Sequence, residues 1–346
     1  MKRRPAFATA AAVTALLLLA TAAAAAPPSP PPGSSRPYLD KAFTNLRTTP
    51  EAAPVQYGAA PPIDPTIGPG DPFRRPLDPS GNEILNLWAT IPQDNEATDR
   101  PAIILVHGGG FRGGIGKAFP LLEGMEDYAS RGYVLVSIEY RIDTTSDCQA
   151  VQDYTGDPTD PDYLAMRAQC ERGILAAQQD TQAAVRWVRR NASRHGVDPN
   201  KVAVGGFSAG AVTAANVAYN SDLAGDFAYS RGDDPDADSR VQAAFGSSGC
   251  NYDPTTIGPG DSPTSFIASE LDSLVDYDDC VVPSFRTARE RGLVAELRSY
   301  CGSRLHASRL YQAHQVATDR QWTTFLVREM GIYSGMRPPS ALGFCP

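Results

Sequence analysis

The chain alternates short apolar runs with longer amphipathic segments, a pattern typical of strands and helices that follow one another. Residues 101–106 and 132–140 are almost wholly apolar. Runs of this kind suit strands that are buried on both faces of a parallel sheet. Residues 117–131, between them, have mixed character and are predicted as a helix. This order predicts an α/β fold, with a mostly parallel sheet and helices on both faces.

The same alternation continues toward the end of the chain. Further strands are predicted from Glu83 onward and at residues 201–205, 241–249, 264–269 and 294–300; helices are predicted at 163–195, 209–219 and 308–330. In the first of these helices, apolar residues recur at the spacing of one helical face. A loop excursion is expected at residues 143–165, which are rich in Asp, Thr and Pro.

Two segments precede the first predicted strand. Residues 1–26 join Met-Lys-Arg-Arg to a weakly apolar run that ends in small residues, and these are the parts of a secretory signal peptide. An uncleaved membrane anchor is the alternative, since the run is about long enough to span a bilayer. Residues 27–80 are rich in proline and are predicted as an extended arm. Residues 81–346 are predicted to form one domain without internal repeats.

Charge narrows the range of partners. Without the three basic residues of the predicted signal peptide, 28 basic side chains would face 39 acidic ones, a net charge of about −11. An acidic surface argues against nucleic acid and anionic membranes as partners. No later segment is apolar enough to cross a bilayer, so stable membrane insertion is not expected, and we expect a monomer.

Six cysteines follow the predicted signal peptide: Cys148, Cys170, Cys250, Cys280, Cys301 and Cys345. An even number in an exported chain predicts three disulfides. The sequence allows fifteen pairings, of which we favour the sequential one. A metal site is the alternative, but Cys-x-x-Cys and Cys/His clusters are absent from the sequence, so we expect no bound metal.

Candidate chemistry begins at Gly206-Phe-Ser208-Ala-Gly210, which fits the pattern G-x-S-x-G. A serine hydroxyl becomes a useful nucleophile when a tight turn between strand and helix holds it near a base and near oxyanion donors. This pentapeptide has an apolar strand before it and a small-residue helix after it. The alternative is a glycine-rich turn without chemistry.

A second motif, His107-Gly108-Gly109-Gly110-Phe111, directly follows the predicted strand that ends at Val106. Successive glycines let backbone N–H groups converge on one point, as a developing oxyanion requires. A dinucleotide-binding loop is the alternative, but the complete G-x-G-x-x-G spacing is missing.

Together the two motifs resemble the α/β-hydrolase superfamily, in particular its esterase and lipase branch with a His-Gly-Gly-Gly motif. The resemblance covers about residues 83–330. It implies an α/β-hydrolase catalytic domain with oxyanion donors in the backbone of Gly109, Gly110 and Ala209, and no metal or organic cofactor. It also implies the order nucleophile, acid, histidine along the chain.

That order limits the candidates for the base. Of the four histidines, only His306 and His314 follow Ser208. His306 is expected on a loop between the last strand and the closing helix, at the carboxyl edge of the sheet. His314 is expected inside the helix, so we favour His306.

The acid is expected between Ser208 and the histidine. Residues 266–277 resemble the family segment in which an apolar strand leads to a short loop that carries Asp and then Val, and Asp272 takes that place. Glu270 and Asp276 remain alternatives. Ala268-Ser269 stands where many members of the family have His-Gly.

These features predict a secreted serine carboxylic-ester hydrolase that acts through an acyl-enzyme on a small-molecule or polymer-borne ester. A secreted serine peptidase or amidase on the same fold is the first alternative. A non-catalytic binding protein on a hydrolase scaffold is the second. The loops at residues 143–165 and 250–262 are expected to border the pocket.

Overall fold

A computed structural model describes residues 36, 38–48, 55–64, 75–93, 97–114, 116, 125–221, 238–337 and 342–346. The predicted signal peptide lies outside the described residues, and so do residues 117–124 of the helix predicted at 117–131. The rest of that predicted helix contains α2, at Glu126–Ser130.

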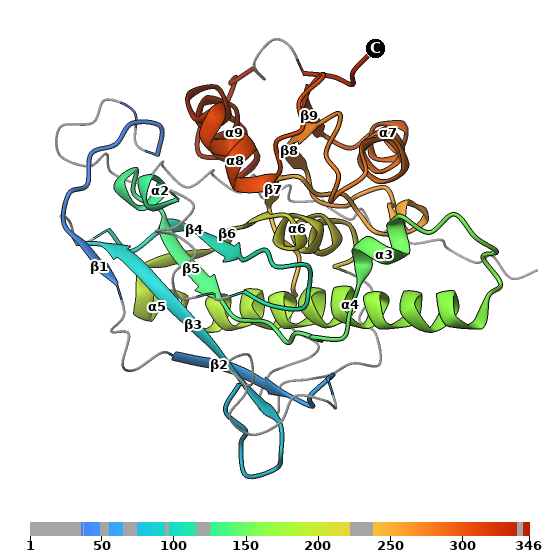
Figure 1. The fold of residues 1–346 in the computed structure, drawn as a ribbon. Coiled ribbons are helices and arrows are strands. Elements are labelled where there is room, and N and C mark those ends of the chain that lie inside the picture. The colour runs from blue at the N-terminus through green and yellow to red at the C-terminus, as the bar shows by residue number, and fades with distance from the viewer. Residues whose placement is uncertain are drawn as a thin grey trace, which may run out of the picture.

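A nine-stranded sheet forms the centre of the molecule (Figure 1), in the order β1-β3-β5-β4-β6-β7-β8-β9, with β2 also paired to β3. The strands are β1 Leu46–Thr48, β2 Val55–Ala60, β3 Glu83–Pro92, β4 Arg100–Val106, β5 Val134–Ile138, β6 Val197–Phe207, β7 Ala243–Ser247, β8 Thr264–Ser269 and β9 Ala295–Tyr300. Strands β4 to β9 run parallel to one another, while β3 is antiparallel to β1, β2 and β5. The predicted mostly parallel sheet is confirmed.

Helices cover both faces of this sheet because alternate side chains of each strand point to opposite sides. In β4, Ile104 packs in the core that contains α4 (Pro161–Arg190) and α6 (Ala209–Tyr219). Its neighbours Ile103 and Leu105 pack in the second core, with α2, α8 (Ala307–Ala313) and α9 (Gln315–Glu329). Among the described residues, no helix combines the length and apolar character that a membrane span requires.

Several elements differ from the predicted pattern. The closing helix is divided at His314, which caps α8 and begins α9. The long helix ends at Arg190 and is followed by the short α5, Ala192–His195. The excursion after β5 contains α3, Cys148–Gln152. A π-helical turn at Tyr277–Val281 leads into α7, Val282–Glu290, and neither was predicted, because their acidic and proline residues resemble a loop.

The arm predicted at residues 27–80 contributes to the sheet. Both β1 and β2 lie within it and pair with β3. Short strands at a sheet edge carry a weak local signal, because their pairing depends on a partner that is distant in sequence. The predicted boundary at residue 81 therefore falls inside the sheet.

Three disulfides join Cys148 to Cys170, Cys250 to Cys280 and Cys301 to Cys345. All six cysteines lie in the described part of the chain, and each is bonded. The sequential pairing is confirmed.

Candidate active site

Ser208 occupies a tight turn between β6 and α6. Its backbone has φ 55° and ψ −125°, a conformation that L-residues rarely adopt and that costs about 1–3 kcal/mol. The glycines on either side permit the turn. A Cβ at Gly206 would lie 2.3 Å from the carbonyl carbon of Gly210, and a Cβ at Gly210 would lie 2.0 Å from the carbonyl oxygen of Val106. The motif therefore needs glycine at both positions for close packing of backbone on backbone.

His306 joins Ser208 to Asp272. Its Nε2 lies 2.8 Å from Oγ of Ser208, and its Nδ1 lies 2.8 and 3.0 Å from the two carboxylate oxygens of Asp272. A carboxylate can only accept, so Nδ1 of the neutral ring donates to Asp272 and Nε2 is left to accept the proton of the serine hydroxyl. The three side chains selected from sequence order thus form one continuous hydrogen-bonded chain.

The alternatives for base and acid have other partners. The ring of His314 stacks on Tyr300, with 3.8 Å between ring centroids. Glu270 accepts a hydrogen bond from the N–H of Gly302 (2.6 Å), and Asp276 accepts one from the N–H of Asp279 (2.7 Å).

The Asp272 carboxylate is almost fully buried, with 2% of its side chain exposed. Burial by itself raises the pKa of Asp272. The hydrogen bond and the charge of His306 lower it, as do the N–H of Leu274 and the hydroxyl of Ser248. The result is a pKa below the ordinary value, so this carboxylate is ionised at neutral pH.

Ser247 and Ser248, at the end of β7, hold the loop that carries His306. The hydroxyl of Ser247 donates to the carbonyl of Ala307 (2.9 Å), and the hydroxyl oxygen of Ser248 accepts the N–H of Ala307 (2.9 Å). Ser248 has φ 55°, a backbone conformation that residues other than glycine rarely adopt. Sequence reasoning missed both residues. Their signal is a Ser-Ser-Gly at the carboxyl end of the buried strand beside β6.

The glycine loop after β4 passes directly beside Ser208. A Cβ at Gly108 would lie 2.9 Å from the carbonyl oxygen of Phe207 and 3.3 Å from Cβ of Ser208. Gly109 and Gly110 have positive φ, at 118° and 62°. Within the described residues, the backbone N–H groups of Gly109, Gly110 and Ala209 have no hydrogen-bond partner. Three backbone donors in the two segments that meet at Ser208 are therefore unused within the described structure.

All of these groups come from one edge of the sheet. The glycine loop follows β4, Ser208 follows β6, Ser248 follows β7, Asp272 follows β8 and His306 follows β9. Because these strands are parallel, their carboxyl ends lie together. Segments far apart in sequence thus meet at one site.

The side chain of His107 contacts the backbone of the glycine loop. Its ring stacks on Tyr140 with 4.2 Å between centroids, and its Nδ1 lies 2.7 Å from the carbonyl oxygen of Gly108. The ring is buried, and its Nε2 has no partner in the described structure. Burial lowers the pKa of His107 to about 4, against the opposing hydrogen bond to Gly108. The imidazole is therefore neutral in the folded protein.

This burial predicts a loss of stability in mild acid. Below its ordinary pKa of 6.5, the unfolded chain binds a proton at His107 that the folded chain does not take up until pH about 4. Stability therefore falls as the pH falls between these values, by about 2 kcal/mol from pH 7.5 to pH 5. Urea unfolding at pH 7.5 and pH 5 measures this loss. The decrease in the free energy of unfolding should be about 2 kcal/mol smaller in His107→Asn than in the wild-type protein. An equal drop in both proteins would contradict the prediction.

A cavity of about 820 Å³ opens onto the triad. Ser208, His306 and the glycine loop line it on one side. Apolar side chains in its lining include Phe111, Ile174 and Val212. The loops predicted to border the pocket contribute α3 and Tyr252. This volume lies within the range of sites for small organic molecules.

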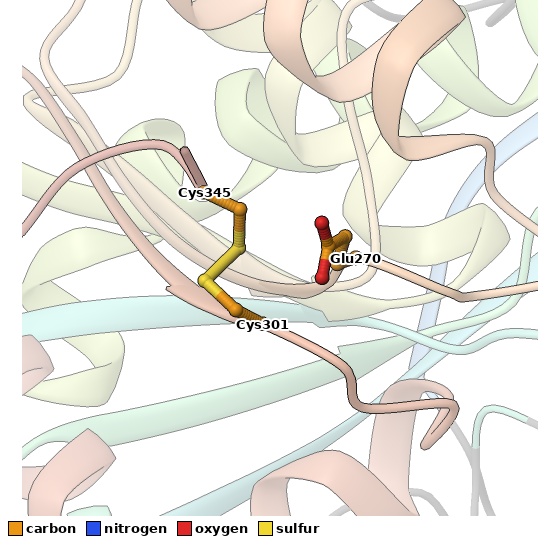
Figure 2. A group of neighbouring side chains, drawn as sticks. All are labelled: Glu270, Cys301 and Cys345. Atoms are coloured by element: carbon orange, nitrogen blue, oxygen red, sulfur yellow. A yellow bond between two sulfur atoms is a disulfide. The ribbon is translucent and has the colours of Figure 1, made fainter.

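One grouping of possible metal ligands occurs in the described part of the chain, away from this cavity. Figure 2 shows Glu270 beside Cys301 and Cys345, whose ligand atoms lie within 4.8 Å of one another. The two sulfurs are bonded to each other, so neither offers a thiolate. Glu270 instead binds the N–H of Gly302.

Comparisons with known proteins agree with this architecture. The BD-FAE family model matches residues 89–155 and 162–252. Fumonisin B1 esterase of Sphingopyxis macrogoltabida is 34% identical over 127 residues, 37% of this chain and 21% of that protein. Juvenile hormone esterase of Heliothis virescens is 29% identical over 128 residues, 37% of this chain and 19% of that protein. The chain thus spans about a fifth of the length of these curated relatives.

Solved structures extend the similarity to most of the fold. Thermogutta terrifontis esterase 2 phosphorylated by paraoxon aligns over 72% of this chain and 91% of its own, with 20% identity and a TM-score of 0.54. The propionate-bound form of the same esterase aligns with a TM-score of 0.53 over the same shares of the two chains. In its sheet order the chain has a fold of the α/β-hydrolase type, and its partial sequence matches are to esterases and lipases.

Proposed function

We propose that this protein is a serine hydrolase of carboxylic esters, with Ser208 as nucleophile, His306 as general base and Asp272 as the acid that orients the base. One observation carries the proposal: the hydrogen-bonded chain from Ser208 through His306 to Asp272 lies beside three unpartnered backbone N–H groups. The two named relatives support the choice of carboxylic esters, since both are esterases.

In the proposed mechanism, Ser208 attacks the ester carbonyl carbon while His306 takes the hydroxyl proton. The carbonyl oxygen becomes an oxyanion that accepts hydrogen bonds from the N–H groups of Gly109, Gly110 and Ala209. Asp272 stabilises the imidazolium. Collapse of the tetrahedral intermediate breaks the bond to the alcohol, which leaves with the proton from His306 and gives the acyl-enzyme.

Water completes the cycle in the second half of the reaction. His306 takes a proton from a water molecule, whose oxygen attacks the acyl carbon. A second tetrahedral intermediate forms and collapses, and Ser208 leaves with the proton held by His306. The carboxylic acid is released and the enzyme returns to its starting state.

We also propose that the protein is exported. Disulfides form and persist in oxidising compartments, and each of the six cysteines is paired. The signal-like composition of residues 1–26 is consistent with this location. A small-molecule or polymer-borne ester outside the cell would then be the substrate.

The proposal is tested with the purified protein, a fluorophosphonate probe and a matched pair of substrates. We expect mass spectrometry to find one phosphonyl group, on the peptide that contains Ser208. We also expect p-nitrophenyl butyrate to be hydrolysed much faster than the corresponding p-nitroanilide. Unlabelled protein that hydrolyses neither substrate would overturn the proposal, and preferential hydrolysis of the anilide would identify an amidase instead.

A further inference from the structure

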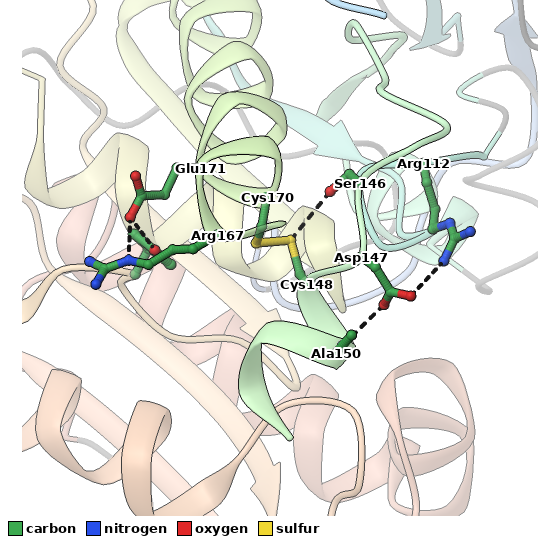
Figure 3. Close-up of a disulfide and its surroundings, with 9 residues drawn as sticks. Arg112, Ser146, Asp147, Cys148, Ala150, Arg167, Cys170 and Glu171 are labelled. Carbon is green, nitrogen blue, oxygen red and sulfur yellow. Dashed lines mark hydrogen bonds and ion pairs between the residues drawn. A yellow bond between two sulfur atoms is a disulfide. The ribbon is translucent and has the colours of Figure 1, made fainter. Parts of the chain in front are cut away.

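A five-residue helix, α3, forms one wall of the cavity. Its N-cap Asp147 and four of its own residues line the cavity, and these are Cys148, Gln149, Val151 and Gln152. Figure 3 shows α3 beside the much longer α4, with the Cys148–Cys170 disulfide between them. The wall therefore consists of an element that is far smaller than the helices around it.

This helix has little packing of its own. None of its residues is buried, although Val151 and Cys148 make partial contact with the core. Its N-terminus is capped by Asp147, which accepts the N–H of Ala150 at 3.1 Å. A helix this short is not stable without tertiary contacts, because nucleation costs more than one turn of hydrogen bonds returns. What holds α3 to the domain therefore determines the shape of the cavity.

The Cys148–Cys170 disulfide links the exposed helix α3 to the long, partly buried helix α4. Cys170 is buried in α4, a helix of 30 residues. The same part of α4 is tied to another segment of the cavity lining, because the hydroxyl of Tyr252 donates to Glu171 at 2.7 Å. Cys170 is thus held in the core, and Cys148 at the other end of the disulfide belongs to α3, which lines the cavity.

Two further contacts attach α3 to the catalytic loops. Asp147 forms an ion pair with Arg112, two residues after the glycine loop, at 3.6 Å. Gln152 accepts the N–H of Asp276, in the loop that also carries Asp272, at 3.2 Å. The ion pair is half exposed and of the kind that contributes little, so the covalent link to α4 is the strongest of the three attachments.

We propose that α3 determines which ester substrates fit the pocket, by limiting the size of the group that extends from Ser208, and that the Cys148–Cys170 disulfide holds α3 in the limiting position. The inference rests on the proposed esterase function. It assigns selectivity to an element outside the triad and outside the oxyanion loop.

The first test removes the disulfide in the full-length protein. Cys148→Ala/Cys170→Ala is compared with wild type on p-nitrophenyl esters from acetate to octanoate, and on acetates of alcohols from phenol to larger aryl alcohols. We expect the ratio of kcat/KM for the largest to the smallest substrate to rise about tenfold in at least one series. Cys301→Ala/Cys345→Ala is the matched control, because that disulfide lies outside the cavity lining, and its ratios should stay within twofold of wild type.

A second variant keeps the disulfide and fills the space instead. Gln149→Trp adds bulk at another residue of α3 that lines the cavity and leaves the contact of Gln152 with Asp276 in place, and the same ratio should fall about tenfold. Unchanged ratios in both variants would overturn the inference, even if wild type hydrolyses every ester. A wild-type protein that hydrolyses none of them and takes up no fluorophosphonate would instead refute the proposed function, so the two failures are distinguishable.

Discussion

Replacing Ser208 with alanine is expected to lower kcat for a p-nitrophenyl ester by about a millionfold, the size of loss seen when a triad nucleophile is removed. The reason is geometric. Oγ of Ser208 lies 2.8 Å from Nε2 of His306, and among the described residues no other hydroxyl forms a hydrogen bond with that nitrogen. Without this hydroxyl, the imidazole of His306 has no hydrogen-bonded nucleophile to deprotonate. Steady-state kinetics with active-site titration of the wild type measures the loss.

Two comparisons make this result specific. Ser334→Ala, at an exposed serine distant in sequence from every site segment, should keep the wild-type rate. His306→Ala added to Ser208→Ala should cause little further loss, because residues that act as one unit are not additive. Retention of substantial activity in Ser208→Ala, or a large additional loss in the double variant, would contradict the assigned roles.

Replacing Gly109 with alanine is expected to lower kcat by about 100- to 1000-fold, the cost of losing one oxyanion donor. A Cβ at this position would lie 2.2 Å from the carbonyl oxygen of Gly113, and the backbone φ of 118° is one that L-residues rarely adopt. The glycine loop must therefore move. Its N–H groups would then leave the positions in which we propose that they bind the oxyanion, whereas the hydrogen bonds among Ser208, His306 and Asp272 would remain.

The control for this variant separates strain from catalysis. Gly292→Ala also places a side chain at positive φ, 79°, but no atom lies within 4 Å of its Cβ. Both variants should lose some stability, measured by thermal denaturation, and only Gly109→Ala should lose kcat. Equal kcat in the two variants would show that the glycine loop does not supply a donor that matters to the rate.

Local pattern was sufficient for much of the fold. The predicted strand at 264–269 and the predicted helix at 209–219 match β8 and α6 at both ends. Both have local signals, since β8 contains the apolar run Phe266-Ile-Ala268 and every residue of α6 is small or apolar enough to be buried. The helix at 308–330 was less well predicted, because the structure divides it at His314, whose ring stacks on Tyr300 of β9.

The two glycine motifs located the site in the sequence, because only glycine fits where one backbone segment approaches another. Gly206, Gly210 and the glycine loop are required where backbone approaches backbone, and this requirement is visible in the residue types themselves. The order of nucleophile, acid and base then selected Asp272 and His306, whose side chains meet that of Ser208 through hydrogen bonds. Their chemical roles remain a proposal.

By itself, therefore, the sequence determined the alternation of strands and helices, the positions of the two glycine turns and a short set of candidate side chains, because each of these depends on residues close together in the chain. Only the tertiary structure decided that β1 and β2 join the sheet, that Ser248 binds the backbone of the histidine loop, and that α3 lines the cavity. These features depend on contacts between segments distant in sequence, and such contacts leave no periodic pattern in any one of the segments that make them.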